Sequence, residues 1–172
     1  MSLRSLPEIK AFDRPARFEW HWPREPLMRW APAPMAADAA NDPSTISIFD
    51  VIGEDYWSGG GFTAKRMEAA LRSIGAAKPV TVAINSPGGD VFEGMTIFNL
   101  LRAHKGEVTV KVMGIAASAA SIIAMAGDRI IMGVGSVLMI HNSWGLTLGN
   151  RHAHAESMEV LGLIDGEMAA VY

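Results

Sequence analysis

The sequence contains no cysteine. This absence excludes a disulfide framework, a thiolate zinc site and a cysteine nucleophile, and it suits a cytoplasmic location. The chain also has little excess charge, since 15 Lys and Arg residues stand against 18 Asp and Glu residues and leave a net charge of −3. Partners such as nucleic acid or an anionic membrane surface need a basic stripe or a polybasic arm, which the sequence lacks. We therefore expect no nucleic acid and no membrane among its partners.

The sequence also lacks an uninterrupted apolar run of the kind that a signal peptide or a membrane span requires. Acidic and basic residues are mixed among the apolar ones between positions 4 and 13, which does not fit a secretory signal. The long apolar stretch 121–140 carries Asp128 and Arg129 at its centre. Each charge there would cost about 2.5–3.5 kcal/mol inside a bilayer. We therefore expect this stretch to form core strands and a helix.

Composition divides the chain near residue 43. Residues 1–43 hold most of the prolines and show neither helical nor strand periodicity, so we interpret them as an irregular arm. The three tryptophans of the arm favour packing along the body or against a neighbouring subunit, with disorder as the alternative. Residues 44–172 form one predicted domain, and an apolar content of 49% can supply its core. The final helical pattern stops at Tyr172 without a glycine or proline, so we expect this domain to be truncated at its C-terminal end.

Within 44–172, strand patterns alternate with helical spacing. The expected strands cover residues 46–52, 80–84, 108–113, 130–132 and 137–140, and the expected helices cover 63–75, 91–101, 118–126 and 150–172. This alternation is typical of an α/β fold in which parallel strands are joined by right-handed βαβ units. In such a sheet, ligand chemistry gathers where strands end and helices begin. The two loops that meet this description are 85–89 and 114–118.

Two of the expected helices carry apolar residues at helical spacing, and we assign these faces to the core. The glycine-rich turn 58–61 precedes the first helix and lacks the lysine and hydroxyl of a phosphate-binding loop, so we interpret it as a flexible turn. The apolar faces consist of Val91, Met95, Phe98 and Leu101 in the second helix and Met158, Leu161, Ile164, Met168 and Val171 in the last.

Ser118 is the candidate nucleophile. It lies where a strand becomes a helix, and the four alanines around it leave room for a substrate carbonyl. The helix N-terminus offers unpaired N–H groups that favour an oxyanion, and Gly88 can bring a second N–H close because it has no Cβ. We assign the amides of Gly88 and Ala119 to an oxyanion hole. His141 follows a strand and is the candidate general base, because an imidazole can accept a proton near neutral pH.

Each of these residues also has an ordinary structural interpretation. A serine among alanines is often a helix N-cap or a packing residue, a histidine at a strand end is often held by a structural hydrogen bond, and a double glycine is often a turn. Other hydroxyls compete with Ser118, namely those of Ser86, Ser121 and Ser136. Ser121 is expected one turn into the helix and Ser86 precedes a rigid proline, so neither lies on an exposed turn.

Three motifs resemble, in order and spacing, the motif blocks of the Clp protease proteolytic subunit family. They are Ile84-Asn85-Ser86-Pro87-Gly88-Gly89, Gly114-Ile115-Ala116-Ala117-Ser118 and Met139-Ile140-His141-Asn142. The resemblance extends from about Ile46 to Tyr172. The third block and the Gly149-Asn150-Arg151 that follows it are most similar to the Clp-like prohead proteases encoded beside capsid genes in tailed phages and prophages.

The resemblance implies a crotonase-like fold with a long C-terminal handle helix, beginning near Asn150, through which rings of seven subunits stack. It implies a serine endopeptidase without cofactor or metal, with Ser118 as nucleophile, His141 as base, and Gly88 and Ala119 as oxyanion donors. The implied partners are further copies of the chain, a protein or peptide substrate such as a capsid or scaffold protein, and an AAA+ unfoldase. The implied location is the cytoplasm of a bacterial host.

The sequence departs from the family at the third member of the catalytic triad. The orienting aspartate of the family lies beyond the handle helix, and this sequence stops inside that helix. Asp165 lies on the helix itself, and we do not assign it the role. Replacement of the orienting aspartate in a related triad lowered kcat by about ten-thousandfold. We therefore expect the chain as given to be nearly inactive and the full-length protein to carry the acid further along.

Two other functions remain open from the sequence. A crotonase-type acyl-CoA enzyme would explain the glycines but would leave Ser118 and His141 without a role. An inactive, ring-forming structural homologue would fit the missing aspartate and the tryptophan-bearing arm. A metal site at His152, His154 and Glu156 is not expected, because helical residues two apart point to different sides.

Overall fold

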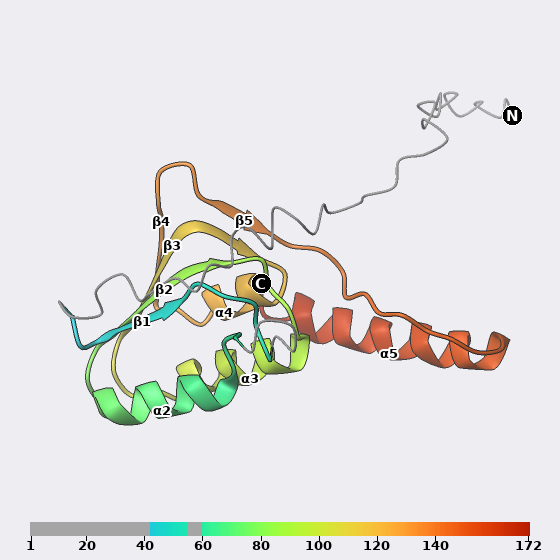
Figure 1. Cartoon of the computed structure of the whole chain (residues 1–172), viewed down its shortest axis with the longest axis horizontal. Helices are drawn as coiled ribbons and strands as arrows, with labels where there is room; N and C mark the ends of the chain where they lie inside the picture. Colours follow the sequence, from blue (N-terminus) through green and yellow to red (C-terminus); the bar gives the residue numbers. More distant parts are fainter. Residues whose placement is uncertain (1–41, 55–59) are drawn as a thin grey trace, which may run out of the picture. The chain divides into compact units, whose positions relative to one another are not determined.

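A computed structural model of the chain describes residues 42–54 and 60–172. The irregular arm predicted for 1–43 lies outside the described residues except for its last two positions. Part of the predicted glycine-rich turn, 58–59, lies outside them as well. Within the described residues the fold alternates strands and helices, as the sequence predicts (Figure 1).

The centre of the fold is a parallel sheet of five strands among the described residues. Each strand runs parallel to its neighbour, in the order β1-β2-β3-β4. β5 pairs, also in parallel, with the C-terminal end of β3. This confirms the predicted α/β class. The strands are β1 (Thr45–Ile48), β2 (Val80–Ser86), β3 (Val108–Ala117), β4 (Arg129–Met132) and β5 (Val137–Met139).

Four helices follow the strands in the described part of the chain. Their ends match local signals in the sequence: Thr63 caps the first by accepting from Arg66 N, and Gly75 ends it with a φ of 108°. Asp90 caps the next by accepting from the amides of Phe92 and Glu93. The helices are α2 (Ala64–Ile74), α3 (Val91–Arg102), α4 (Ala119–Ala124) and α5 (Arg151–Ala169).

The core is built from branched apolar side chains of the central strands and from the helices beside them. Val82, Val110, Val112 and Ile97 are completely buried. The helices α3 and α4 approach closely at Gly94, where an added Cβ would lie 3.0 Å from the Cβ of Ala119. Glycine is therefore needed at this crossing to bring α4 close to α3.

This crossing corrects the apolar face predicted for α3. The sequence analysis placed Val91, Met95, Phe98 and Leu101 on the apolar face. Leu101 is buried and Phe98 packs against the core as predicted, but the other buried residues of α3 are Gly94 and Ile97. The helix is rotated relative to the prediction because its glycine, rather than its larger side chains, faces α4.

The stretch 121–140 is only partly core, which is a second correction. The residues of α4 are buried, but every residue of β4 is exposed. β4 lies at the end of the strand order, and among residues 42–54 and 60–172 no further strand covers its outer edge. Ile130, Ile131 and Met132 each keep between 41% and 45% of their surface exposed.

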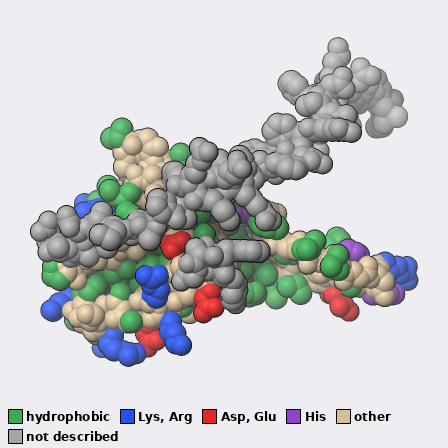
Figure 2. Space-filling view, in the orientation of Figure 1, with side chains coloured by type: hydrophobic (Ala, Val, Ile, Leu, Met, Phe, Trp, Pro, Cys, Tyr) green, Lys and Arg blue, Asp and Glu red, His purple; other side chains and the backbone are tan. Residues whose placement is uncertain are grey.

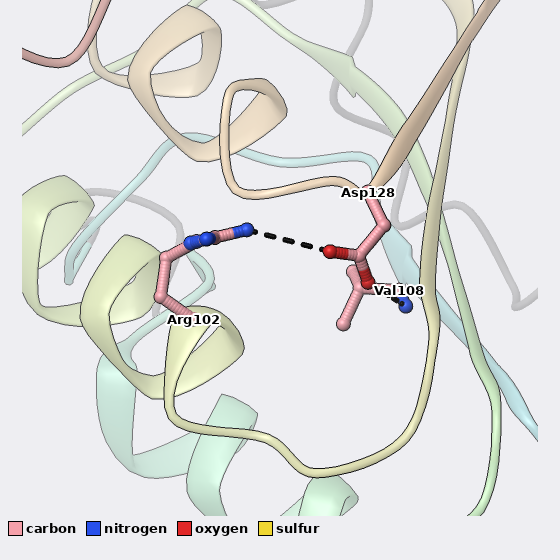
Figure 3. A network of polar contacts seen from close by, with 3 residues as sticks. All are labelled: Arg102, Val108 and Asp128. Carbon is pink, nitrogen blue, oxygen red and sulfur yellow. Dashed lines mark hydrogen bonds and ion pairs between the residues drawn. The ribbon is translucent and has the colours of Figure 1, made fainter.

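Asp128 joins three elements at the opposite end of β3 from the predicted site. One carboxylate oxygen accepts from Arg102 Nη1 at 3.4 Å and the other from the Val108 amide at 2.9 Å (Figure 3). Arg102 ends α3, Val108 begins β3, and Asp128 directly precedes β4. Both charged side chains are about half exposed, so the bond to the Val108 amide is the more significant contact for stability.

α5 lies beside the segment 140–149, which connects it to β5. Thr147 Oγ1 donates to Ser157 Oγ at 2.8 Å, and Ser143 bonds to the C-terminal half of the helix. The predicted apolar stripe is buried only towards that end: Met168 is buried, but Met158 is 73% exposed. No helix of the described residues is long and apolar enough to cross a membrane.

Candidate active site

Ser118 occupies a strained turn between β3 and α4. The sequence analysis placed residues 114–118 in a loop, but β3 continues to Ala117, so Ser118 alone makes the turn into the helix. Its φ is 53° and its ψ is −126°, and among the described residues it is the one non-glycine with a positive φ. Such a conformation costs about 1–3 kcal/mol, and backbone strain of this kind clusters at functional sites. Ser118 occupies the N-cap position of α4, but its side chain makes no capping hydrogen bond.

The pairing of β3 with β5 brings His141 to Ser118. Ala117 is in register with Met139, and the Ser118 amide donates to the Met139 carbonyl at 2.9 Å. His141 follows two residues later, and its Nε2 lies 2.8 Å from Ser118 Oγ. Two residues that are 23 positions apart in the sequence therefore form a hydrogen-bonded pair, as the strand-end argument predicted.

The chemistry of this pair depends on which atom holds the proton. If the Ser118 hydroxyl donates to Nε2, the neutral imidazole carries its proton on Nδ1. Among the described residues, Nδ1 of His141 has no hydrogen-bond acceptor. The pair can thus transfer the serine proton to the ring, while the site where an orienting acid would bind is free of such contacts in the described part of the chain.

The glycine loop after β2 packs directly against the Ser118 turn. Gly88 is buried and has a φ of 94°, and a Cβ added to it would lie 2.5 Å from the Ala117 carbonyl oxygen and 2.7 Å from Ser118 Cβ. The same position is 3.0 Å from the Ala119 nitrogen. A glycine is required here because any side chain would collide with the backbone of Ala117 and with Ser118.

The predicted oxyanion donors differ in their availability. Within the described part of the chain, the Ala119 amide has no acceptor, so it is free to bind a substrate oxygen. The Gly88 amide, in contrast, donates to Ser86 Oγ over a long distance of 3.2 Å. The neighbouring Gly89 is exposed, and its amide is also without an acceptor among the described residues. Sequence reasoning named only the first glycine of the pair, although the same motif contains the second.

Hydrogen bonds to Ile52 and to strand β3 fix the glycine turn and the end of β2 before it. The Ile52 amide donates to the Gly88 carbonyl and the Ile52 carbonyl accepts from the Asp90 amide, both at 2.9 Å. Asn85 Oδ1 accepts from the Ile115 amide at 3.2 Å, where the register between β2 and β3 shifts. These bonds hold the backbone of the first and second motifs side by side.

None of the three competing serines bonds to a base in the described residues, and two of them have structural contacts. Ser86 is buried and its hydroxyl donates to the Asp50 carbonyl at 2.6 Å. Ser121 is also buried, and its hydroxyl donates to the Ser118 carbonyl at 2.6 Å and lies 2.7 Å from the Tyr172 hydroxyl. Ser136 Oγ is buried without a partner in the described residues.

Asp165, to which the sequence analysis gave no role, bonds to the segment that follows His141. Its Oδ1 accepts from both the amide and the hydroxyl of Ser143, each at 2.6 Å. The Ser143 hydroxyl, then the Ser143 amide, lower the pKa of Asp165, with smaller contributions from Asn142 and from the positive charge of His141, against the opposing effect of burial. Asp165 is therefore an ionised carboxylate at neutral pH, close to His141 in space.

No group of three or more His, Cys, Asp or Glu side chains in the described part of the chain could hold a metal ion. The side chains considered for a metal site on α5, those of His152, His154 and Glu156, are all exposed.

Comparison with known proteins identifies relatives of part of this chain. The family described as Clp protease matches residues 64–172, which is more than half of the chain. An ATP-dependent Clp protease proteolytic subunit 2 of Treponema denticola is 44% identical over 59 residues, covering 34% of this chain and 30% of that protein. An ATP-dependent Clp protease proteolytic subunit of Deinococcus radiodurans is 30% identical over 98 residues, covering 55% of this chain and 48% of that protein.

A further proteolytic subunit, from Bacteroides fragilis, is 34% identical over 71 residues, covering 40% of this chain and 34% of that protein. The matched segments thus span less than half the length of each of these three relatives. The extent of the family match and the parallel α/β sheet agree with the resemblance that the three motifs indicated. The chain belongs to the Clp protease family.

Proposed function

We propose that the chain is a serine endopeptidase that hydrolyses peptide bonds through Ser118 and His141. The observation that carries this proposal is the 2.8 Å contact between His141 Nε2 and Ser118 Oγ, on a turn whose backbone is strained. A serine hydroxyl is a weak nucleophile near neutral pH, and a ring nitrogen at this distance can take its proton as the bond to carbon forms.

In the proposed reaction, Ser118 Oγ attacks the scissile carbonyl carbon while His141 Nε2 takes the hydroxyl proton. The carbonyl oxygen becomes an oxyanion that accepts from the Ala119 amide and from one amide of the double glycine. The intermediate collapses to an ester on Ser118 as the protonated His141 gives its proton to the leaving amine. Water, activated by the same imidazole, then hydrolyses the ester and frees the serine.

The second oxyanion donor is either Gly88 or Gly89. Gly88 lies against the Ser118 turn but has its amide on Ser86 Oγ, so a substrate oxygen would have to compete for that long bond. Gly89 has an amide that is free among the described residues. An acidic acceptor on His141 Nδ1 would fix the ring in the required tautomer, and without one we expect turnover to be low.

We further propose that the chain is of the phage or prophage prohead-protease type and processes capsid or scaffold proteins in a bacterial cytoplasm. The support is the resemblance of Met139-Ile140-His141-Asn142 and Gly149-Asn150-Arg151 to that group. An AAA+ unfoldase is a possible additional partner of a Clp-type peptidase. The peptidase would need the unfoldase only if the substrate is folded before it is cleaved.

Assembly with further copies of the chain, in rings of seven, is the proposed quaternary structure. Its support is the apolar surface along α5 and the segment beside it, which Figure 2 shows as exposed hydrophobic side chains. Surfaces of this kind mark sites of protein association. The residues concerned include Trp144, Leu146, Leu148, Met158 and Leu163, each at least 68% exposed.

Labelling with a serine-directed fluorophosphonate tests the proposed activity. We expect the reagent to form a covalent adduct on Ser118, located by peptide mass mapping, and to form none with Ser118→Ala. His141→Gln should slow labelling strongly, since the hydroxyl loses its base. Ser73→Ala, which removes an exposed serine on α2, is the matched control and should label normally.

The outcomes of this test separate the proposed peptidase from its two rivals. A protein that forms rings but never labels would contradict the peptidase and support a structural role. Hydrolysis of acyl-CoA esters that survives Ser118→Ala would instead favour an acyl-CoA enzyme, which needs only the backbone amides.

A further inference from the structure

His141 lies outside the regular part of the sheet. β5 ends at Met139, and residues 140–148 have no regular secondary structure. The ladder of β3 and β5 therefore fixes the backbone up to two residues before the imidazole but not beyond it. Some other contact must hold the chain after His141, because a displacement of about 1 Å in a catalytic group can lower a rate by about a hundredfold.

That contact is made by Ser143 with α5. The Ser143 amide and hydroxyl both lie 2.6 Å from Asp165 Oδ1, and the hydroxyl also lies 3.2 Å from the Leu161 carbonyl oxygen. A hydroxyl has one proton, and the short distance to an ionised acceptor assigns it to the carboxylate. Asp165 thus accepts two charge-assisted bonds from one residue, which restrains both its main chain and its side chain.

Asp165 lies where it can restrain the segment after His141 while substrate is bound. Asp165 is half-buried, and it lies on the part of α5 that also contributes the buried Met168. Leu161 and Asp165 are one helical turn apart, so Ser143 lies against two successive turns of the same helix, while both of its hydrogen bonds go to Asp165. A helix is a more rigid support than an irregular segment, because its own backbone bonds are already satisfied.

We propose that Asp165 is a positioning residue that holds the His141 imidazole against Ser118 through its two hydrogen bonds to Ser143. This inference rests on the proposed function, since positioning matters only if His141 is the base. It does not make Asp165 the orienting acid of the triad, because the carboxylate bonds to Ser143 and makes no hydrogen bond to the His141 ring.

The test compares labelling rates of Ser118 in the full chain carrying Asp165→Ala, Ser143→Ala, both substitutions, or neither. We expect Asp165→Ala to slow labelling by about ten- to a hundredfold, and Ser143→Ala to slow it less because the Ser143 amide keeps its bond. The double variant should be no slower than Asp165→Ala, since both changes break the same contact. Asp165→Asn retains an acceptor oxygen and should recover part of the rate.

Glu167→Gln is the matched control, since it removes one negative charge from an exposed position on the same helix. It should label at the rate of the unchanged chain. Urea denaturation of each variant shows that the protein is folded, and Ser143→Ala provides the test if Asp165→Ala does not fold. A second readout is the NMR signal of the His141 ring, which should broaden or split in Asp165→Ala as the ring loses its fixed position.

These readouts distinguish failure of the positioning role from failure of the peptidase. Wild-type labelling rates in folded Asp165→Ala and Ser143→Ala would overturn the positioning role and leave the peptidase intact. A wild-type chain that does not label would contradict the proposed peptidase. In that case the NMR signal of the His141 ring still tests the positioning role, and an unchanged signal in Asp165→Ala would contradict that role as well. Additive effects of the two substitutions would also contradict the proposal.

Discussion

At Ser118 the backbone is held in an unfavourable conformation by its neighbours. The amide of Ser118 donates to the Met139 carbonyl, and its carbonyl accepts from both the amide and the hydroxyl of Ser121. Several hydrogen bonds of this kind, each worth about 0.5–1.5 kcal/mol, can offset a strain of about 1–3 kcal/mol. The strained turn is therefore a property of the packed site and not of the local sequence, in which only alanines flank the serine.

Gly88→Ala should damage the site more than an ordinary glycine substitution. The new Cβ would need a φ of 94° and would lie within 2.7 Å of Ser118 Cβ and closer still to the Ala117 carbonyl oxygen. Relief requires the two backbones to separate, so we expect a loss of about 1–3 kcal/mol in the free energy of unfolding and little labelling of Ser118. Urea denaturation and fluorophosphonate labelling measure the two effects. A stable and fully labelled Gly88→Ala variant would show that the loop and the turn are not packed as described.

Tyr172→Phe should change how stability depends on alkaline pH. Desolvation by burial raises the pKa of the Tyr172 phenol, and the hydrogen bond with Ser121 opposes this increase. The folded state therefore keeps the phenolic proton to higher pH than the unfolded state, so this contribution to stability is complete below about pH 10 and is lost as the pH rises further. Urea denaturation at a series of pH values from 8 upwards should show wild type with a larger free energy of unfolding than Tyr172→Phe, by about 0.5–1.5 kcal/mol at pH 8. This difference should become smaller as the pH rises. A constant advantage across the series would contradict the assignment.

Helix α5 contains glycines at positions where the packing of the helix does not require them. Gly162 lies in the middle of α5, is exposed, and would meet no atom within 4 Å if it carried a Cβ. We expect Gly162→Ala to raise the free energy of unfolding by about 0.5–1 kcal/mol, because alanine loses less backbone entropy in a helix. Gly94→Ala is the control within α3. Its Cβ would press on Ala119, so this substitution should not raise the free energy of unfolding. The urea midpoints of the Gly162→Ala and Gly94→Ala variants measure these changes in stability. Equal changes in the two variants would contradict the prediction.

The sequence predicted most elements because each has local signals. The cap Thr63, the terminal Gly75 and the cap Asp90 are visible in the sequence, and both helices begin and end accordingly. The exposure of β4 and the rotation of α3 could not be predicted, because they depend on which element ends the sheet and which residue meets α4. A run such as Ile130 to Met132 has the same pattern in a central strand and in an edge strand.

The candidate site shows the same limit. The strand-end argument brought Ser118 and His141 together correctly, because parallel strands present their C-terminal ends at one edge. The contact of Asp165 with Ser143 was missed, since it depends on how α5 lies along an irregular segment. The bond from the Gly88 amide to Ser86 was missed as well, because the direction of a single N–H within a glycine turn has no sequence signal.

At the scale of the whole molecule, the exposed apolar surface predicts association with further copies of the chain. Leu146→Glu and Leu163→Glu place a charge where we expect a subunit contact, so each should shift the chain towards monomer. Lys65→Glu changes charge at an exposed position on α2 and should leave the assembly unchanged. Analytical ultracentrifugation measures the mass in each case. A wild-type chain that is monomeric at high concentration would reject the proposed ring.

The junction of β3 with β5 has a consequence for the cell that makes this protein. In the proposed peptidase, Ser118 reaches its base only when Met139 has paired with Ala117, so a nascent chain still short of residue 141 would contain the serine without the histidine. A ribosome-bound or unfolded copy therefore presents no danger to neighbouring polypeptides. On the proposed function, the ability to cleave peptide bonds would arise only together with the completed sheet.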